Sequence, residues 1–298
     1  MEKRIVLVTG ATSGIGRHAA LELARAGHRV FATGRQREAL ASLEKEAAGL
    51  PGTPLETLVL DVSKPESVEE ARRTIEAKTG GHGVDAVVNN AGYGVVGPVE
   101  EIDTAAMMKQ YETNVFGLLR VTKAFLPKMR ERGFGRVVNV SSIGGRITFP
   151  MMGMYNSTKY AVESLSDAMR VELAPFGIGV SLIEPGSIKT EFADVAVSTL
   201  EKREGSPYEA AIAQADQMRA KFDSMAVGPA VVTRAIQKAI ESRRPRARYV
   251  APGYAVSTIW LMKLLPTRWV DALMGRMSGL TRKNLVGDAA PRRLAATA

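Results

Sequence analysis

The sequence predicts one α/β domain built on a doubly wound parallel sheet of about seven strands, with helices on both faces. Short apolar runs rich in β-branched residues alternate with longer stretches of helical periodicity, a pattern typical of βαβ units. No low-complexity linker separates two self-contained cores. The chain has 298 residues, of which 45% are hydrophobic and 24% charged, and these values suit one large globular domain. We therefore expect residues 1–298 to form a single domain.

The expected strands are runs of consecutive apolar residues. A run without a polar face predicts a strand that is buried on both sides, as strands in parallel sheets are. The strands are expected at 5–8, 30–33, 58–60, 84–88, 136–140, 180–183 and 249–250.

Helices are expected between these strands. Apolar residues recur at helical spacing from 15 to 26, and Gly27 then favours a helix end. Pro65 favours a helix start just before 66–78. The expected helices are 15–26, a polar helix that ends at 48, and the segments 66–78, 104–132, 153–175 and 199–222, followed by an apolar helix within 254–280.

The residue counts exclude several kinds of site. The absence of cysteine excludes a disulfide scaffold, a thiolate metal site and a cysteine nucleophile. With only three histidines, we expect no metal site built on a histidine cluster. Met1–Arg4 run directly into an apolar strand without the apolar region of a secretory signal, so we expect a cytoplasmic location.

The net charge of +9 is the one unusual number, and it is compatible with nucleic acid, an acidic lipid surface or an anionic ligand. The surplus is uneven, because residues 1–190 carry +2 and residues 191–298 carry +7. The cluster Arg243–Arg248 is short and has few interleaved aromatic residues, so we interpret it as a solvated helix end and expect no nucleic-acid partner.

A glycine-rich turn joins the first strand to the first helix. It reads Thr9-Gly-Ala-Thr-Ser-Gly-Ile-Gly16, and its glycines, with the free N–H groups of the following helix, suit a dinucleotide phosphate. The residues expected to line this phosphate site are Gly10, Ser13, Gly14, Ile15 and Gly16. Arg17 follows the last glycine, which excludes a Walker A loop. A purely structural turn is the alternative.

The end of the second strand carries Arg35 and no acidic residue. An acid at this place would bind a ribose 2′-OH, whereas a guanidinium matches a 2′-phosphate. The sequence therefore favours NADP(H) over NAD(H). The alternative is that Arg35 is a solvated surface residue.

Tyr155 and Lys159 are four residues apart on an expected helix and so share one face. An ammonium group close to the phenol would lower its pKa from about 10 and make it an acid or base near neutral pH. Many such pairs are only a half-buried tyrosine and a solvated lysine. Ser142, just past the fifth expected strand, would face the same crevice at the carboxyl ends of the strands.

Other segments with site character follow the fourth and sixth strands. Asn90, Ala91 and Gly92 are small enough to permit close approach of a cofactor, and Pro185-Gly186 forms a rigid turn on the same side of the sheet. Asn114 is a poor helix former inside an expected helix, although a satisfied side-chain hydrogen bond is the usual reason for such a residue.

Together these segments resemble the short-chain dehydrogenase/reductase family, and hydroxysteroid and retinol dehydrogenases within it. The resemblance covers residues 4–190, in the order and at the spacings customary for the family. It implies a Rossmann-type fold and a homodimer or homotetramer. The glycine spacing is unlike that of the extended branch, and the Tyr155–Lys159 spacing is unlike that of enoyl reductases.

The resemblance also implies roles for individual residues. Tyr155 would be the general acid or base, Ser142 would hold the substrate oxygen, and Lys159 would lower the pKa of Tyr155 and bind the nicotinamide ribose. Asn114 would position a water that connects Lys159 to solvent.

For the cofactor, the resemblance implies that Asp61 binds the adenine and that Val62 lines its site. It places Asn90 near the adenosine ribose, and Ile188 and Thr190 near the nicotinamide amide.

The substrate side is less defined. The resemblance implies that residues 191–226 form a lid. Met151, Met152 and Met154 precede Tyr155 and suit an adaptable apolar pocket wall, with core filling as the alternative. We expect a bulky hydrophobic ketone, aldehyde or alcohol, such as a steroid, a retinoid or a long-chain carbonyl.

Residues 254–280 are apolar and contain both tryptophans, Trp260 and Trp269, but no uninterrupted run of about 18 apolar residues. A packed helix, a flap over the substrate entrance and an interfacial membrane segment are all compatible with this pattern. We favour packing or a flap over peripheral membrane contact, because exposed tryptophan is a liability on a soluble protein.

The sequence as a whole predicts an NADP-dependent oxidoreductase that acts on a small hydrophobic carbonyl or alcohol. The alternative is a catalytically silent NADP-sensing binding protein with the same fold. Retention of both Tyr155 and Lys159 favours the enzyme.

Overall fold

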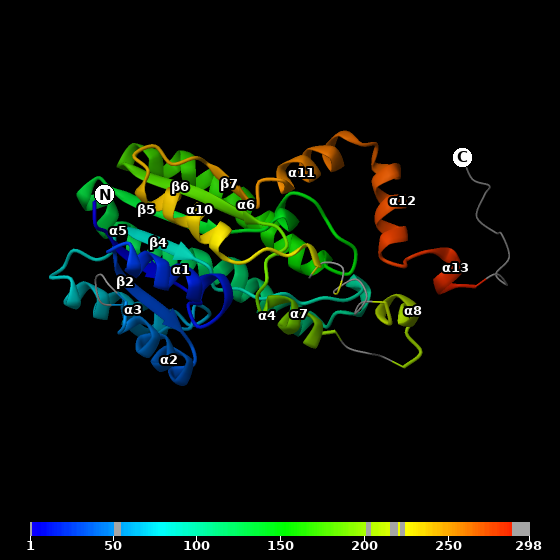
Figure 1. The fold of residues 1–298 in the computed structure, drawn as a ribbon, viewed down its shortest axis with the longest axis horizontal. Coiled ribbons are helices and arrows are strands. Elements are labelled where there is room, and N and C mark those ends of the chain that lie inside the picture. Colours follow the sequence, from blue (N-terminus) through cyan, green and yellow to red (C-terminus); the bar gives the residue numbers. More distant parts are fainter. Residues whose placement is uncertain (1, 51–54, 201–203, 215–219, 221–223, 288–298) are drawn as a thin grey trace.

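A seven-stranded parallel sheet forms the centre of the computed structural model, which describes residues 2–50, 55–200, 204–214, 220 and 224–287 (Figure 1). The strand order is β3-β2-β1-β4-β5-β6-β7, and each neighbouring pair is parallel. The strands are β1 (Ile5–Val8), β2 (Arg29–Gly34), β3 (Leu55–Val59), β4 (Ala86–Asn89), β5 (Gly135–Val140), β6 (Ile178–Pro185) and β7 (Arg248–Ala251). The predicted doubly wound α/β fold is confirmed.

Helices cover both faces of this sheet and alternate with the strands along the chain. Those of the first 190 residues are α1 (Gly14–Arg25), α2 (Arg37–Ala47), α3 (Pro65–Lys78), the 3₁₀ turn η1 (Val99–Glu101), α4 (Thr104–Tyr111), the π-helical segment η2 (Glu112–Gly117), α5 (Leu118–Arg132), η3 (Ile143–Gly145), α6 (Gly153–Leu173) and η4 (Ala174–Phe176). The later ones are α7 (Phe192–Ser198), α8 (Glu209–Ile212), α10 (Ala230–Glu241), α11 (Ala255–Leu264), α12 (Thr267–Met277) and α13 (Arg282–Leu285).

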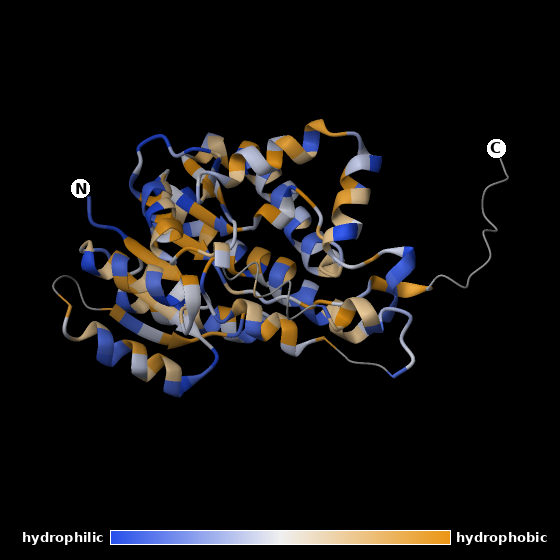
Figure 2. Cartoon of the chain, turned by 45° about the vertical axis from the view of Figure 1, so that its right-hand side comes forward, coloured by the Kyte–Doolittle hydropathy of each residue, from blue (hydrophilic) through white to orange (hydrophobic). Residues whose placement is uncertain are grey.

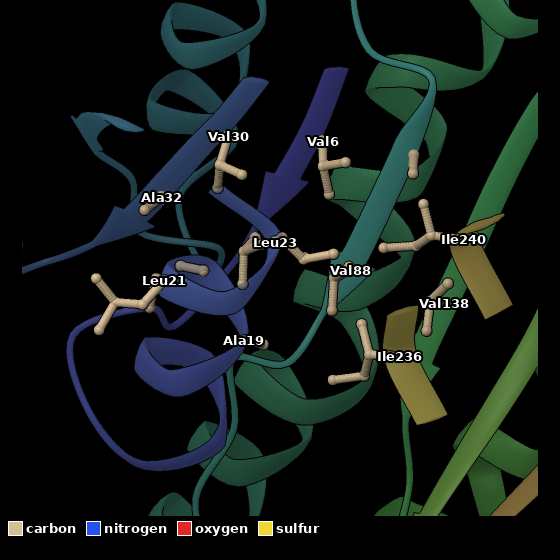
Figure 3. Packing of buried hydrophobic residues seen from close by; sticks show 14 of the residues in the cluster. Val6, Ala19, Leu21, Leu23, Val30, Ala32, Val88, Val138, Ile236 and Ile240 are labelled. Atoms are coloured by element: carbon tan, nitrogen blue, oxygen red, sulfur yellow. The ribbon is translucent and has the colours of Figure 1, made fainter. Parts of the chain in front are cut away.

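The two faces of the sheet pack into two separate cores, because successive side chains of a strand point to opposite faces. Val6 and Val8 of β1 pack with α1, α2 and α10, whereas Leu7 between them packs with α3 and α5. Figure 3 shows the first core, in which Leu23 of α1 and Ile236 of α10 lie against the strands. Burial on both faces explains why the strands are continuous apolar runs.

Several expected elements differ in their bounds before residue 190, among them the fourth strand, Ala86–Asn89 against 84–88, and the sixth, Ile178–Pro185 against 180–183. The third strand begins at Leu55, three residues earlier than expected. The helix expected at 104–132 is divided into α4, η2 and α5. The helix expected to end at Pro175 ends at Leu173, and Pro175 lies in a 3₁₀ turn, since proline supplies no N–H for a helical hydrogen bond.

The C-terminal third differs more. The single helix expected at 199–222 is wrong for its described part. The short helices α7 and α8 are separated by Gly205, with φ of +76°, and by Pro207. Helix α10 ends at Glu241, just before the Arg243–Arg248 cluster that was interpreted as a helix end, but its bounds were not predicted. The apolar helix expected within 254–280 is two helices, and Pro266 ends the first and caps the second.

Within the part of the chain that the structure describes, no helix is long and apolar enough to cross a bilayer. The described residues also hold no group of three potential metal ligands.

Candidate active site

The ends of β1 and β4 meet in a network centred on Thr9. Its hydroxyl accepts hydrogen bonds from the backbone N–H groups of Asn90 and Ala91, at 3.0 and 3.1 Å. The Asn90 amide in turn donates to the carbonyl oxygens of Thr9 and Gly10, at 3.1 and 3.0 Å. These contacts fix the glycine-rich turn against the loop after β4, so two segments that the sequence assigned to the cofactor lie together.

Two glycines in the turn leave room that any side chain would fill. A Cβ atom on Gly16 would lie 2.2 Å from the Gly10 carbonyl oxygen and 2.4 Å from the Asn90 amide nitrogen. Gly10 has φ of +64°, and its Cβ would lie 2.8 Å from the Ala91 Cα atom. Ser13 precedes α1 without making a side-chain capping bond, so its hydroxyl occupies none of the first N–H groups of the helix. The turn therefore fits the phosphate of a dinucleotide.

The remaining residues of the predicted cofactor site line the same edge. Thr190 lies beside Gly14, at 3.2 Å from where a Gly14 Cβ would be. Gly186 donates a backbone hydrogen bond to Ala251, at 2.9 Å. Ile15 and Ile188 pack against the first core, and Ala91 packs against the second. Pro185 is paired with Ala251 of β7, and Gly92 lies close to Asn114.

Arg35 lies exposed at the end of β2, where its charge acts on two neighbouring groups. Burial opposes ionisation of Asp61, yet the hydrogen bonds from Ser63 and the charge of Arg35 hold the pKa of its carboxyl below the usual value. Burial raises the pKa of the Tyr93 phenol, and Arg35 partly offsets this increase. Among the described residues, no hydrogen bond or ion pair engages the Arg35 guanidinium. Its donors therefore remain available to an anion.

Val62 follows Asp61 in the segment after β3. Its side chain is buried and packs tightly on η2, because a Cβ on Gly117 would lie 2.8 Å from the Val62 Cγ2 atom. The side chain that the sequence assigned to the adenine site thus also fixes the position of η2.

Tyr155, Ser142 and Lys159 meet at the end of β5. The Tyr155 phenol is buried and hydrogen-bonded to the Ser142 hydroxyl, which also accepts the Gly144 N–H at 3.0 Å. The Lys159 ammonium donates to the Val140 carbonyl oxygen at 2.8 Å and lies 5.7 Å from the centroid of the Tyr155 ring. The three predicted catalytic side chains are therefore in one place.

The protonation state of Tyr155 differs from the prediction. We expected Lys159 to lower the pKa of the phenol, but burial raises it to about 12, and the Ser142 hydrogen bond only partly offsets the increase. The ammonium is bound to the Val140 carbonyl, which explains why its effect on the phenol is missing. Burial also lowers the pKa of Lys159, to about 8. Tyr155 is thus held as a neutral phenol, the form that can donate a proton.

Asn114 lies within the π-helical segment η2 and is almost fully buried. Its oxygen accepts the Tyr93 N–H at 3.1 Å, and its nitrogen donates to the Tyr93 carbonyl at 2.9 Å and to the Thr158 hydroxyl at 3.1 Å. Thr158 precedes Lys159 on α6, so Asn114 connects the loop after β4 to the helix that carries Tyr155 and Lys159. The predicted water relay remains a prediction.

A charged network behind Lys159 was missed by the sequence reasoning. Glu163 lies one turn beyond Lys159, and burial, with the neighbouring Glu184 carboxylate, raises the pKa of Glu163 to about 7. Arg248 binds both carboxylates at 3.1 Å, and Arg146 binds Glu184 at 3.0 Å. The four-residue spacing from Lys159 to Glu163 was the only signal in the sequence.

The substrate side of Tyr155 is apolar. The ring of Phe192, the first residue of α7, lies 5.1 Å from the Tyr155 ring, centroid to centroid. Met151, Met152 and Met154 are all partly exposed, which argues against core filling and favours the pocket-wall interpretation. Part of the predicted lid thus reaches the predicted acid, while residues 201–203, 215–219 and 221–223 of it lie outside the described part of the chain.

A family model for short chain dehydrogenases matches residues 4–201. The chain belongs to this family. The resemblance deduced from the glycine turn and from Ser142, Tyr155 and Lys159 is therefore confirmed.

Two of the three relatives described here match this chain over more than nine tenths of both sequences. An uncharacterized oxidoreductase of Escherichia coli strain K12, YbbO, is 36% identical over 91% of this chain and 94% of its own. An NADPH-dependent 3-dehydrocapnine reductase of Ornithobacterium rhinotracheale is 32% identical over 91% and 95%. The human 17-beta-hydroxysteroid dehydrogenase type 1 is 40% identical over 70% and 62%.

Among solved structures, a short chain dehydrogenase/reductase of Burkholderia phymatum in complex with NAD superposes with a TM-score of 0.77. It is 26% identical, over 88% of this chain and 93% of its own.

Proposed function

We propose that this short-chain dehydrogenase is an NADP-dependent oxidoreductase that interconverts a ketone or aldehyde and an alcohol, with Tyr155 as acid and base. The observation that carries the proposal is the meeting of the buried Tyr155 with Ser142 and Lys159 at the end of β5, where the Ser142 hydroxyl acts on the Tyr155 phenol and the Lys159 ammonium lies 5.7 Å from the centre of its ring. A carbonyl oxygen placed at these two hydroxyls would accept hydrogen bonds from both.

The side chains divide the work. Bound NADP(H) would supply the hydride, which no amino-acid side chain can. Tyr155 donates its phenolic proton to the developing alkoxide, and Ser142 holds the same oxygen. The Lys159 ammonium, charged below a pKa of about 8, is bound to the Val140 carbonyl in this structure; turned towards Tyr155, it would stabilise the phenolate that proton donation leaves there. In alcohol oxidation the same phenolate takes the proton back.

The preference for NADP rests on Arg35, whose guanidinium is exposed at the end of β2 and has no partner among the described residues. The cradle between Gly10 and Gly16 fits either dinucleotide. The relatives point both ways, because one is NADPH-dependent and a solved neighbour holds NAD. A free guanidinium at the 2′-position favours the phosphorylated form.

The apolar surroundings of Tyr155 support a bulky hydrophobic substrate. Phe192 and the partly exposed methionines before Tyr155 offer contact area and no charged partner for a polar substrate. The alternative is a silent NADP sensor, and the gathering of Tyr155, Ser142 and Lys159 at the end of β5 favours the enzyme over it. We also propose that the protein forms a homodimer or homotetramer and is located in the cytoplasm.

The test is turnover of a panel of hydrophobic ketones with NADPH and with NADH. We expect activity with NADPH, and a loss of about 10²- to 10⁴-fold in kcat for Tyr155→Phe. Tyr160→Phe, on the same helix but 43% exposed, is the matched control and keeps full activity. Unchanged turnover in Tyr155→Phe would refute the assigned acid, and better turnover of small sugars or hydroxy acids would refute the substrate class.

A further inference from the structure

The two helices α11 and α12 expose apolar side chains in regular stripes. On α11 the stripe is Val256, Trp260 and Leu264, and on α12 it is Trp269, Leu273 and Met277. Each stripe repeats every four residues, so it follows one side of its helix. Trp260 is 60% exposed, Trp269 67% and Leu264 77%.

Packing accounts for only a small part of this surface. Figures 1 and 2 show α11 and α12 standing away from the sheet, with hydrophobic residues distributed along both. Only Ala255 and Ile259 of α11, and Met274 of α12, are buried. Packing, one of the two interpretations favoured for this segment, is therefore not observed for either tryptophan, whereas a flap over the substrate entrance stays a prediction. Exposed apolar side chains gathered in this way mark an interaction site.

The same helices carry unpaired positive charge. Lys263, Arg268 and Arg276 are exposed and have no ion pair within the described residues, and Asp271 is the one acidic residue between Ala255 and Met277. Cations beside exposed tryptophan and leucine are the composition of helices that lie in a lipid interface.

A basic groove joins this surface at the start of α11. The groove, of about 830 Å³, runs between α10 and β7 and is lined by Arg234, Lys238, Arg244 and Arg246, and it reaches Val256 of α11. All four cations are exposed, and none has a side-chain hydrogen bond or ion pair in the described chain. Glu241 also lines the groove, but its carboxylate is bound to His28 and Gln237, so the groove carries a surplus of positive charge that attracts anions.

The charge decides between a lipid surface and a second copy of the chain. In a twofold-symmetric interface each patch meets the same patch of the other copy, which would bring two sets of the cations Lys263, Arg268 and Arg276 together. Anionic headgroups would instead neutralise them, while the acyl region accepts the apolar stripes. We propose that α11 and α12 bind the surface of an anionic lipid bilayer, with Trp260 and Trp269 in the interface.

The position of this surface gives it a role in substrate supply, and that part rests on the proposed function. Gly186, at the candidate active site, lies close to Ala255, the first residue of α11. The Tyr254 hydroxyl donates to the Met225 carbonyl at 3.2 Å, and Gly279 lies against Gln214 near α8. The lipid-binding helices thus connect the end of β7 to the lid, and a hydrophobic substrate dissolved in the bilayer would reach the site at this edge.

The test is flotation of the full-length protein with vesicles of phosphatidylglycerol and phosphatidylcholine in equal parts, compared with phosphatidylcholine alone. We expect binding to the anionic vesicles only, and weaker binding at high salt. Because the chain has only these two tryptophans, a blue shift of intrinsic fluorescence would report their entry into the interface. Neither readout depends on catalysis, so a failure of the proposed function is distinguishable.

Two pairs of variants identify the surface. Trp260→Ser/Leu264→Ser should lower vesicle binding at least about tenfold, whereas Met108→Ser/Val171→Ser, at equally exposed sites elsewhere, should not. Arg234→Gln/Lys238→Gln should lower it about 30-fold, whereas Lys45→Gln/Lys109→Gln should not. Thermal unfolding of each variant checks that it is folded.

Three outcomes would overturn the proposal. These are no flotation with anionic vesicles, equal flotation of wild type and Trp260→Ser/Leu264→Ser, or light scattering showing a dimer that this variant converts to monomers. The last result would assign the stripes to a second copy of the chain.

Discussion

Glu163 lies one helical turn beyond Lys159, and its charge raises the pKa of that lysine against the effect of burial. Glu163 has itself a pKa raised to about 7, mainly by burial, so it ionises just below the range in which Lys159, at about 8, loses its proton. The two titrations are therefore coupled, and Glu163 is a positioning residue for the charge of Lys159.

Replacing Glu163 by Gln should move the alkaline limb of the pH profile of kcat/KM to lower pH. The reason is that the neutral amide no longer stabilises the Lys159 ammonium, so the lysine loses its proton earlier. The exposed Glu172→Gln on the same helix is the control and should leave the profile unchanged. An unshifted profile in Glu163→Gln would show that Glu163 has only a structural role.

The same substitution should change the pH dependence of stability. Glu163 has a pKa of about 7 in the folded protein against 4.5 for the ordinary group, so between these values the folded state retains a proton that the unfolded state releases. The free energy of unfolding should therefore decrease as the pH rises from 4.5 to 7. In Glu163→Gln this contribution should be absent, as measured by urea denaturation across that range.

Arg35→Gln should lower kcat/KM for NADPH about 10- to 100-fold and leave the value for NADH almost unchanged. The loss corresponds to one charge-assisted interaction with the 2′-phosphate. Arg37→Gln, two residues later, is the matched control. If Arg37→Gln shows the loss instead, the cofactor is selected by Arg37 and not by Arg35. Saturation of the wild type by NADH alone would contradict the NADP preference.

Gly16→Ala should abolish tight cofactor binding and lower stability by about 1–3 kcal/mol. The new methyl group would meet the Gly10 carbonyl oxygen and the Asn90 amide, both of which hold the turn in place. Gly49→Ala provides the comparison, since no atom lies within 4 Å of its added Cβ. Fluorescence titration with NADPH and urea denaturation measure the two effects, and equal behaviour of both variants would contradict the packing argument.

Ile236→Ala should lower the free energy of unfolding by about 2–5 kcal/mol, because Ile236 is fully buried between α10 and the sheet (Figure 3). Val171→Ala, at a side chain 71% exposed, should change it by less than about 0.5 kcal/mol. A small effect of Ile236→Ala would show that α10 contributes little to the first core.

Most of the sheet could be predicted because its strands are buried on both faces and therefore read as apolar runs. The edge strand β3 is the exception. Its start was missed because Glu56 and Thr57 are polar, and the structure shows why they are tolerated: Glu56 binds Arg29 and Lys78, and Thr57 binds Glu44. A strand with one open edge can carry such residues, and no apolar run then marks it.

In the site, residues within the continuous motifs were predictable, whereas their partners from distant segments were not. Tyr155 and Lys159 are readable from one helical turn. The effect of Lys159 was mispredicted because the direction of its ammonium depends on the Val140 carbonyl at the end of β5. Arg248 joins Glu163 across 85 residues of sequence, so only the folded sheet brings the network together.

The π-helical segment η2 places a constraint on chain length. A π-helical turn holds more residues than an α-helical turn, and each residue of an α-helix rotates the chain by about 100°. Removing one residue between Glu112 and Gly117 would therefore favour ordinary α-helical bonding and turn α4 relative to α5. Asn114 could then no longer face both Tyr93 and Thr158. Along this stretch, an insertion or deletion of one residue would therefore separate the loop after β4 from helix α6, which carries Tyr155 and Lys159.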